Sequence, residues 1–252
     1  MIPLRDSIPA TRPPVVRNAL IGVCALVWLL QLSQPEGELV YGLGMVPARL
    51  LQGGGVELYG GRYYELPEAY VPDWLTLLTC TFLHGGWLHF LGNMLFLWIF
   101  GDNVEDRFGR LPFLLFYLGC GVAASAAHLV ASGGSLAPTI GASGAIAGVM
   151  GAYMFLYPRS RVLALVPIGF LLIDVVLPAP FFLGYWFVLQ LVQGSIDGGH
   201  GGGVAWWAHI GGFVVGGVVA GCLRVSERLL PAPQSIVLRG RRRTKTPWGQ
   251  RF

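Results

Sequence analysis

Six apolar stretches, joined by more polar connections, constrain this chain more than any other feature of its sequence. A bilayer has a hydrocarbon core of about 30 Å, which an α-helix of roughly 20 mostly apolar residues can cross. Two of the stretches are shorter, so we expect them to lie deep among the others or to be extended by flanking turns. The pattern predicts an all-α membrane protein with six spans, at 15–32, 87–101, 111–130, 143–157, 168–192 and 204–223.

The composition agrees with a chain whose solvent is lipid. Of its 252 residues, 54% are hydrophobic and 12% are charged. Soluble domains average about 25% charged residues, so this chain carries roughly half of the charge that a water-facing surface needs. We find no internal repeat and predict three parts: an amino-terminal segment at 1–14, one membrane domain at 15–225 and a basic, disordered tail at 226–252.

The basic residues predict the orientation in the membrane. Only Arg49 and Arg62, of 17 Lys and Arg, lie in a connection that this arrangement places outside. Cytoplasmic connections carry an excess of Lys and Arg, so both termini are predicted to be cytoplasmic. The basic run in the tail fits the same rule, and we expect a disordered juxtamembrane tail there in preference to a site for nucleic acid or anionic lipid.

Two outer connections have distinctive compositions. The first, 33–82, mixes acidic residues with semi-apolar pieces and is predicted to lie in the membrane interface. The last, 193–203, contains six glycines and is predicted to be a mobile lid over the outer end of the sixth span.

Four polar side chains in the spans indicate a reaction site. Polar groups inside a membrane are costly and usually functional. His89 and Asn93 lie in the second span, Ser143 begins the fourth, and His209 lies in the sixth. These three spans run inward from the outer face, and the groups lie within about two turns of it, at roughly 10 Å depth. A hydroxyl and an imidazole at one depth predict Ser143 as a nucleophile and His209 as its base.

The residues around this pair fit the same interpretation. Gly144 and Gly148 in the fourth span, like Gly212 and Gly216 in the sixth, are spaced by four, which favours close packing of the two helices. Ser143 begins a helix, so its own N–H group is a free donor at the positive end of the helix dipole. With donors from the second span, this group is predicted to form an oxyanion hole.

Three short motifs carry these residues. They are, in chain order, His84-Gly-Gly-Trp-Leu-His89-Phe-Leu-Gly-Asn93, Gly141-Ala-Ser143-Gly144 and Ala208-His209-Ile-Gly211-Gly212. In this order and on these spans, they resemble the three signature motifs of the rhomboid family of intramembrane serine proteases. The resemblance extends from the first span to Leu223 and implies a six-helix bundle with a long interfacial first loop.

The resemblance also implies roles. It makes Ser143 and His209 a catalytic dyad without a third acid, and Asn93 and His89 partners of the Ser143 N–H group in the oxyanion hole. It implies a structural role for His84, Gly141, Gly144, Gly211 and Gly212. No cofactor or metal is implied. The substrates would be transmembrane segments of other membrane proteins, cut in a bacterial plasma (inner) membrane at a site open to the outer face; the oligomeric state is not predicted.

Two features depart from the family pattern. Some relatives stack a Tyr on the catalytic imidazole from the position four residues after the nucleophile, but this position is Ala147 here. Some carry a Trp-Arg pair in the first loop, which this chain lacks. We therefore expect His209 to be oriented by packing against Gly144 and neighbouring aromatic side chains.

Three other functions compete with this one. His84 and His89 are close in sequence, but the His-Glu-x-x-His motif of a zinc protease is missing. Asp174, taken as a buried acid in the fifth span, would suit a small transporter. A further alternative is a rhomboid-like protein that binds membrane clients without cutting them. Such a protein would be recognised by the loss of Ser143 or His209, and both residues are present.

Overall fold

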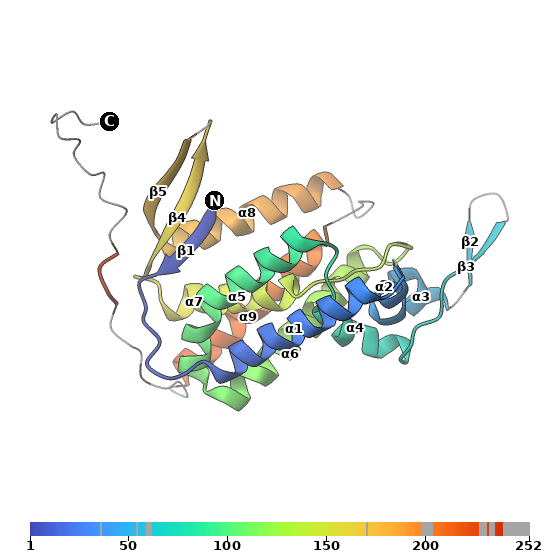
Figure 1. Cartoon of the computed structure of the whole chain (residues 1–252), viewed down its shortest axis with the longest axis horizontal. Helices are drawn as coiled ribbons and strands as arrows, with labels where there is room; N and C mark the ends of the chain where they lie inside the picture. Colours follow the sequence, from blue (N-terminus) through green and yellow to red (C-terminus); the bar gives the residue numbers. More distant parts are fainter. Residues whose placement is uncertain are drawn as a thin grey trace.

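The structure is a computed structural model, and it describes residues 1–35, 37–53, 55–58, 62–169, 171–197, 204–226, 231 and 235–238. Six long helices form a bundle (Figure 1): α1 (Val15–Ser33), α5 (Trp87–Phe108), α6 (Arg110–Ala131), α7 (Ser143–Leu156), α8 (Ala179–Asp197) and α9 (Trp206–Val225). Each of the six predicted apolar stretches overlaps one of these helices. The chain is thus mostly helical.

Four helices are long and apolar enough to cross a bilayer, Val15–Ser33, Arg110–Ala131, Ala179–Ile196 and Trp206–Val225, in the part of the chain that the structure describes. The apolar helix α7 is shorter. Helix α5 has 22 residues and carries polar side chains along its length, including the buried Asn93 and Asn103. The other helices shield these groups from lipid, which explains why a less apolar helix is tolerated here.

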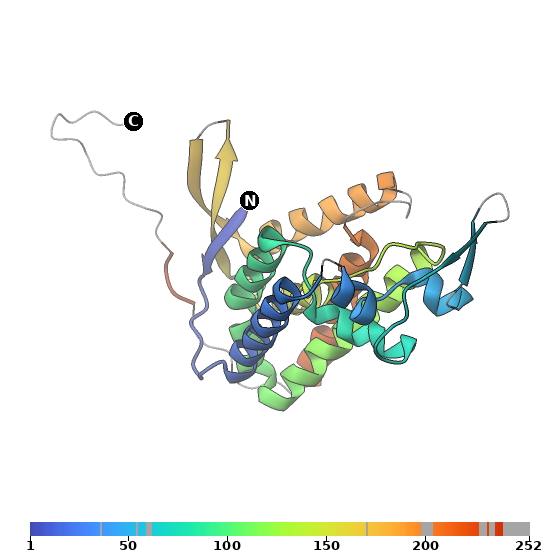
Figure 2. The ribbon, with the colours of Figure 1, turned by 45° about the vertical axis from the view of Figure 1, so that its right-hand side comes forward.

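The described chain is mostly helical, but two small sheets that the prediction of an all-α protein did not include accompany the bundle. Strands β1 (Ile2–Asp6), β4 (Arg161–Ile168) and β5 (Leu171–Pro178) form an antiparallel sheet in the order β1-β4-β5, and β2 (Gly55–Leu58) pairs with β3 (Arg62–Glu65). The two sheets lie at opposite ends of the bundle (Figures 1 and 2). Ile236 donates its N–H group to the carbonyl of Ser7, so the described carboxyl-terminal segment lies beside the amino-terminal one.

The fifth helix starts later than predicted. Residues 161–178 form the β4–β5 hairpin, which turns at Gly169 with a φ of 58°. β-branched residues favour strands, and Pro178 ends the strand before α8 begins at Ala179. Asp174 lies half-buried on β5, so its prediction as a buried acid in a helical span is wrong, and the transporter alternative loses its premise.

The predicted outer lid, 193–203, is shorter at its amino-terminal end than expected. Helix α8 continues to Asp197 and includes Gly194 and Ser195, so residues 193–197 are helix and not loop. A Cβ added at Gly194 would approach the Trp206 side chain to 3.1 Å, so this end of α8 packs closely on the start of α9. The remainder of the lid, 198–203, and the basic run 239–252 lie outside the described residues.

The first connection folds over the end of the bundle where α5, α7 and α9 begin. It contains the short helices α2 (Glu38–Leu43), α3 (Pro47–Gln52) and α4 (Thr76–Thr79), and the 3₁₀ turns η1 (Asp73–Leu75) and η2 (Cys80–Phe82). The buried Arg49 pairs with Asp73 at 2.8 Å and donates hydrogen bonds to the carbonyls of Tyr41, Gly44 and Pro67. One guanidinium therefore holds four separate points of this connection together.

The opposite end of the bundle is held by acids that the sequence analysis did not single out. The Glu105 carboxylate accepts the N–H groups of Val16 and Arg17, at the amino end of α1. Asp106 accepts the N–H and hydroxyl groups of Thr11. Negative charge at a helix amino terminus satisfies its free donors and its dipole, so α5 anchors α1.

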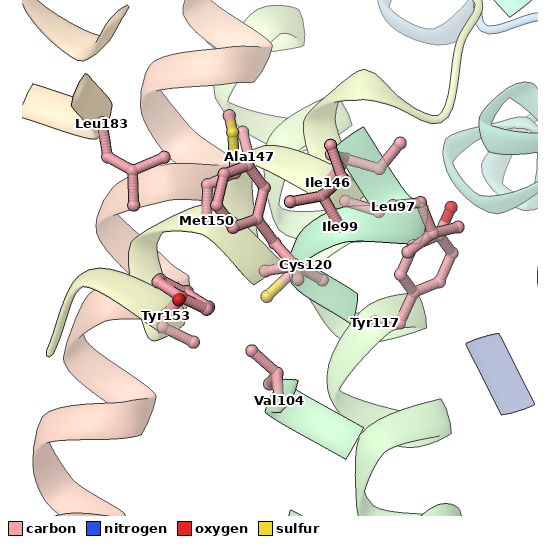
Figure 3. Packing of buried hydrophobic residues seen from close by; sticks show 14 of the residues in the cluster. Leu97, Ile99, Val104, Tyr117, Cys120, Ile146, Ala147, Met150, Tyr153 and Leu183 are labelled. Atoms are coloured by element: carbon pink, nitrogen blue, oxygen red, sulfur yellow. The ribbon is translucent and has the colours of Figure 1, made fainter. Parts of the chain in front are cut away.

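The core between α5, α6 and α7 is close-packed. Figure 3 shows Ile146, Ala147 and Met150 of α7 together with Leu97 of α5 and Cys120 of α6. Ala147 and Leu97 are fully buried. The small Ala147 side chain is thus part of the core on which the start of α7 rests.

Candidate active site

Helices α7 and α9 pack backbone to backbone, which places the two candidate catalytic residues side by side. A Cβ added at Gly212 would overlap the carbonyl oxygen of Gly144, and one at Gly216 would overlap that of Gly148. A Cβ at Gly211 would overlap Ala127 of α6. Side chains at these positions would therefore separate the helices, so glycine is required for this approach.

Ser143 and His209 meet at the ends of these helices. Ser143 is the first residue of α7, and His209 lies in the first turn of α9. The Ser143 Oγ lies 2.7 Å from the His209 Nε2. This is the contact that proton transfer from a serine hydroxyl to an imidazole requires.

The other ring nitrogen of His209 has a partner that the sequence analysis missed. Its Nδ1 lies 2.7 Å from the Oε1 of Gln190 on α8, and the Gln190 side chain is buried. The indole of Trp186, one turn earlier on α8, lies at a ring-centroid distance of 5.6 Å from the imidazole. The available signal was an amide inside the apolar stretch 168–192, which is costly in a membrane without a partner. The orientation of His209 thus depends on α8, in addition to the aromatic packing that was expected.

Asn93 and His89 face the same space from α5. The Asn93 side chain is buried, and its Nδ2 has no hydrogen-bond partner. His89 Nδ1 accepts the N–H group of Gly85 at 3.3 Å, which leaves Nε2 as the protonated nitrogen. That Nε2 lies against Gly141, where an added Cβ would be 2.7 Å away and where φ is 128°. Two side-chain donors therefore converge beside Ser143.

His84 lies behind these donors. Its backbone N–H and carbonyl groups are both hydrogen-bonded by the side chain of Gln31 on α1, and its ring contacts those of His89 and Phe90, each at a centroid distance of 5.3 Å. Burial, and secondarily the neighbouring His89, lower the pKa of the His84 imidazole from 6.5 to about 4. The ring is therefore neutral at pH 7.

We expect His84 to make the fold sensitive to acid. Its pKa is lower in the folded protein, so its contribution to stability is present above pH 6.5 and is lost as the pH falls towards 4, by about 3 kcal/mol in total. His84→Gln removes this titration. In thermal unfolding, the stability advantage of the wild type over this variant should shrink across that pH interval; an advantage that stays constant would contradict the assignment.

A cavity of about 490 Å³ opens over the pair. Its lining includes Ser143 and His209, Asn93 and Phe96 of α5, and Trp186 of α8. A few polar groups thus line a cavity whose other walls are apolar, as is typical of ligand-binding sites. Within the described ranges, no group of three or more His, Cys, Asp or Glu side chains could hold a metal ion.

This arrangement defines a helical integral membrane protein with a serine–histidine pair at a cavity. The sequence comparison agrees: a family model described as "Rhomboid domain" matches residues 71–226, and the chain belongs to the rhomboid family. The matched region includes all three motifs and the residues Asn93, Ser143 and His209.

Several curated relatives are similar over part of their length. The chain is 38% identical over 141 residues to "Rhomboid protease GluP" of Bacillus subtilis, covering 56% of this chain and 25% of that protein. It is 31% identical over 133 residues to "Rhomboid protein 1, mitochondrial" of Saccharomyces cerevisiae, covering 50% and 36%. It is 34% identical over 84 residues to "Putative rhomboid protease YdcA" of Bacillus subtilis, covering 33% and 42%. The chain thus matches less than half of the length of each of these relatives.

Proposed function

We propose that this chain is a serine-type intramembrane endopeptidase that cleaves transmembrane segments of other membrane proteins. The observation that carries the proposal is the 2.7 Å contact between Ser143 Oγ and His209 Nε2 at the wall of an open cavity. The relatives named as proteases support it. A protein that only binds clients has no need of a hydroxyl and an imidazole in this contact.

The reaction follows from these groups. His209 Nε2 takes the Ser143 proton while Oγ attacks the scissile carbonyl. The negative charge that develops on the carbonyl oxygen is stabilised by the Ser143 N–H group, Asn93 Nδ2 and His89 Nε2–H. His209 returns the proton to the leaving amine, which produces an acyl-enzyme. Water then attacks this ester, with His209 as base, and releases the second product.

The proposed arrangement in the membrane has six spans, with both termini in the cytoplasm. Helices α5, α7 and α9 begin at one end of the bundle, while Ile236 and Ser7 meet elsewhere in the fold, beside the first sheet. The distribution of Lys and Arg supports an outward-facing site. We propose the plasma (inner) membrane of a bacterium as the location, with residues 15–225 as the protease domain, preceded by a short segment at 1–14 and followed by a basic tail at 226–252.

Entry of a substrate is proposed from the side of the bundle between α5 and α8. The cavity is lined there by Phe96 of α5 and Trp186 of α8, and these side chains offer an apolar path for an extended segment. A substrate helix must unwind before its carbonyl can reach Ser143, because a helical backbone keeps its carbonyl groups hydrogen-bonded.

Asn93→Ala is expected to slow turnover by about ten- to a thousandfold, because it removes one oxyanion donor among several. Asn93 Nδ2 has no partner in the resting protein, so it is free to bind the charge that forms in the transition state. KM should change little. Steady-state kinetics on a fluorogenic substrate would measure both constants; a raised KM with unchanged kcat would assign Asn93 to substrate docking instead.

The proposed function is tested by reconstitution. The purified full-length protein is placed in liposomes with a single-span substrate, and the new amino termini of the products are determined. We expect a cut within the substrate's membrane segment, near its outer end. Products that never appear, or appear equally with a Ser143→Ala protein, would contradict the proposal.

A further inference from the structure

We infer that Gln190 of α8 is a positioning residue for His209, and that the seating of α8 against α9 therefore sets the reactivity of Ser143. This inference rests on the proposed function and extends it. Its basis is a continuous chain of hydrogen-bonding groups that links α8, α9 and α7.

The orientation of the Gln190 amide follows from its two contacts. Its Nε2 lies 3.3 Å from the carbonyl oxygen of Trp186, and its Oε1 lies 2.7 Å from His209 Nδ1. A backbone carbonyl only accepts, so the NH₂ group must face Trp186 and the amide oxygen must face His209. The opposite orientation would place two oxygens against each other.

The amide oxygen then fixes the proton on the imidazole. Because Oε1 only accepts, His209 Nδ1 carries the hydrogen, and Nε2 keeps its lone pair. That lone pair faces the Ser143 Oγ at 2.7 Å. The chain runs from the Ser143 hydroxyl through His209 and Gln190 to the Trp186 carbonyl, and each contact in it pairs a donor with an acceptor.

Because these groups are buried, the hydrogen bond between Gln190 and His209 contributes strongly to the orientation of the imidazole. Gln190 is 5% exposed and His209 is 9% exposed, so little water competes for their hydrogen bonds. A buried amide without a partner would be costly, and so would an imidazole N–H. The wrong tautomer of the base disables a serine–histidine pair even when its geometry is retained. Gln190 therefore supplies, without charge, the orientation that an acid supplies in soluble serine proteases.

The position of Gln190 also couples the pair to α8. Ser143 and His209 lie on α7 and α9, which glycines lock together, whereas Gln190 is the contribution of a third helix. The side chains that flank it, Val188, Leu189 and Leu191, are exposed, so Gln190 is the inward-facing member of this turn. A shift of α8 away from α9 would break the contact with His209 and leave the imidazole free to rotate.

The test compares three variants in the full-length protein. Gln190→Met keeps the side-chain length but removes both polar atoms, whereas Gln190→Glu keeps an acceptor for Nδ1–H, replaces the amide donor to Trp186 and introduces a carboxyl group. Gln193→Leu is the matched control, since Gln193 is an exposed glutamine one turn further along α8. The rate of Ser143 modification by a small fluorophosphonate, kcat and KM for a membrane substrate, and the thermal midpoint are measured for each.

We expect Gln190→Met to slow both fluorophosphonate modification and kcat by about ten- to a hundredfold with an unchanged KM, because base orientation and not substrate binding is lost. Gln190→Glu should recover part of both rates, and Gln193→Leu should match the wild type. Wild-type rates in Gln190→Met, or equal losses in the Met and Glu variants, would overturn the inference. An active Ser143→Ala protein would instead overturn the proposed function, so the two failures are distinguishable.

Discussion

Ser143→Ala and His209→Ala are each expected to abolish cleavage of a single-span substrate in liposomes, with a loss of at least about ten-thousandfold. The two groups share one hydrogen bond and act as a unit, so neither retains much function alone. The double variant should be no worse than either single one. Quantified cleavage products, together with a thermal midpoint to show folding, measure this.

Ser195→Ala is the matched control. Ser195 is an exposed helix serine whose hydroxyl is hydrogen-bonded to the carbonyl of Leu191 in its own helix, as most membrane serines are. Its loss should leave cleavage at the wild-type rate. A folded Ser143→Ala protein that still cuts would remove the basis of the protease assignment.

Gly212→Ala is expected to lower activity by about a hundredfold or more and to destabilise the protein by roughly 1–3 kcal/mol. A Cβ at this position overlaps the carbonyl oxygen of Gly144, a backbone atom that cannot move independently of α7. The two helices must separate, and Ser143 lies one residue before the point of overlap. Cleavage rates and thermal midpoints measure the two effects.

Gly221→Ala provides the comparison on the same helix, because nothing lies within 4 Å of its added Cβ. Alanine is also the better helix former, so this variant should be at least as stable as the wild type and fully active. If Gly212→Ala behaves like Gly221→Ala, the close approach of α7 and α9 is not what brings Ser143 to His209.

Much of the helical framework could be predicted from local pattern. Apolar stretches predicted the positions of α1, α6, α7 and α9 to within a few residues, because a membrane span must satisfy its backbone hydrogen bonds internally and a helix does so. The four-residue spacing of Gly144 and Gly148, and of Gly212 and Gly216, indicated which helix faces meet. The motifs identified the family, which the comparison confirms.

The features that were missed depend on contacts between distant segments. The run before Pro178 is apolar enough to resemble a membrane helix, but it pairs as β5 with β4, which in turn pairs with the distant β1, and hydropathy does not report these partners. The role of Gln190 could not be predicted from the sequence for a similar reason, because only the packing of α8 on α9 shows that its amide faces His209. Glu105 was not singled out from the sequence, because only the packing of α1 on α5 shows that it binds the amino terminus of α1.

The most direct measurement of the central claim is the location of a covalent adduct. The folded full-length protein is treated with a fluorophosphonate, digested, and examined by peptide mass spectrometry. We predict modification at Ser143 alone, greatly slowed in His209→Ala and absent in Ser143→Ala. An adduct on another serine, or modification of Ser143 at the same rate without His209, would contradict the claim that these two residues form the reactive pair.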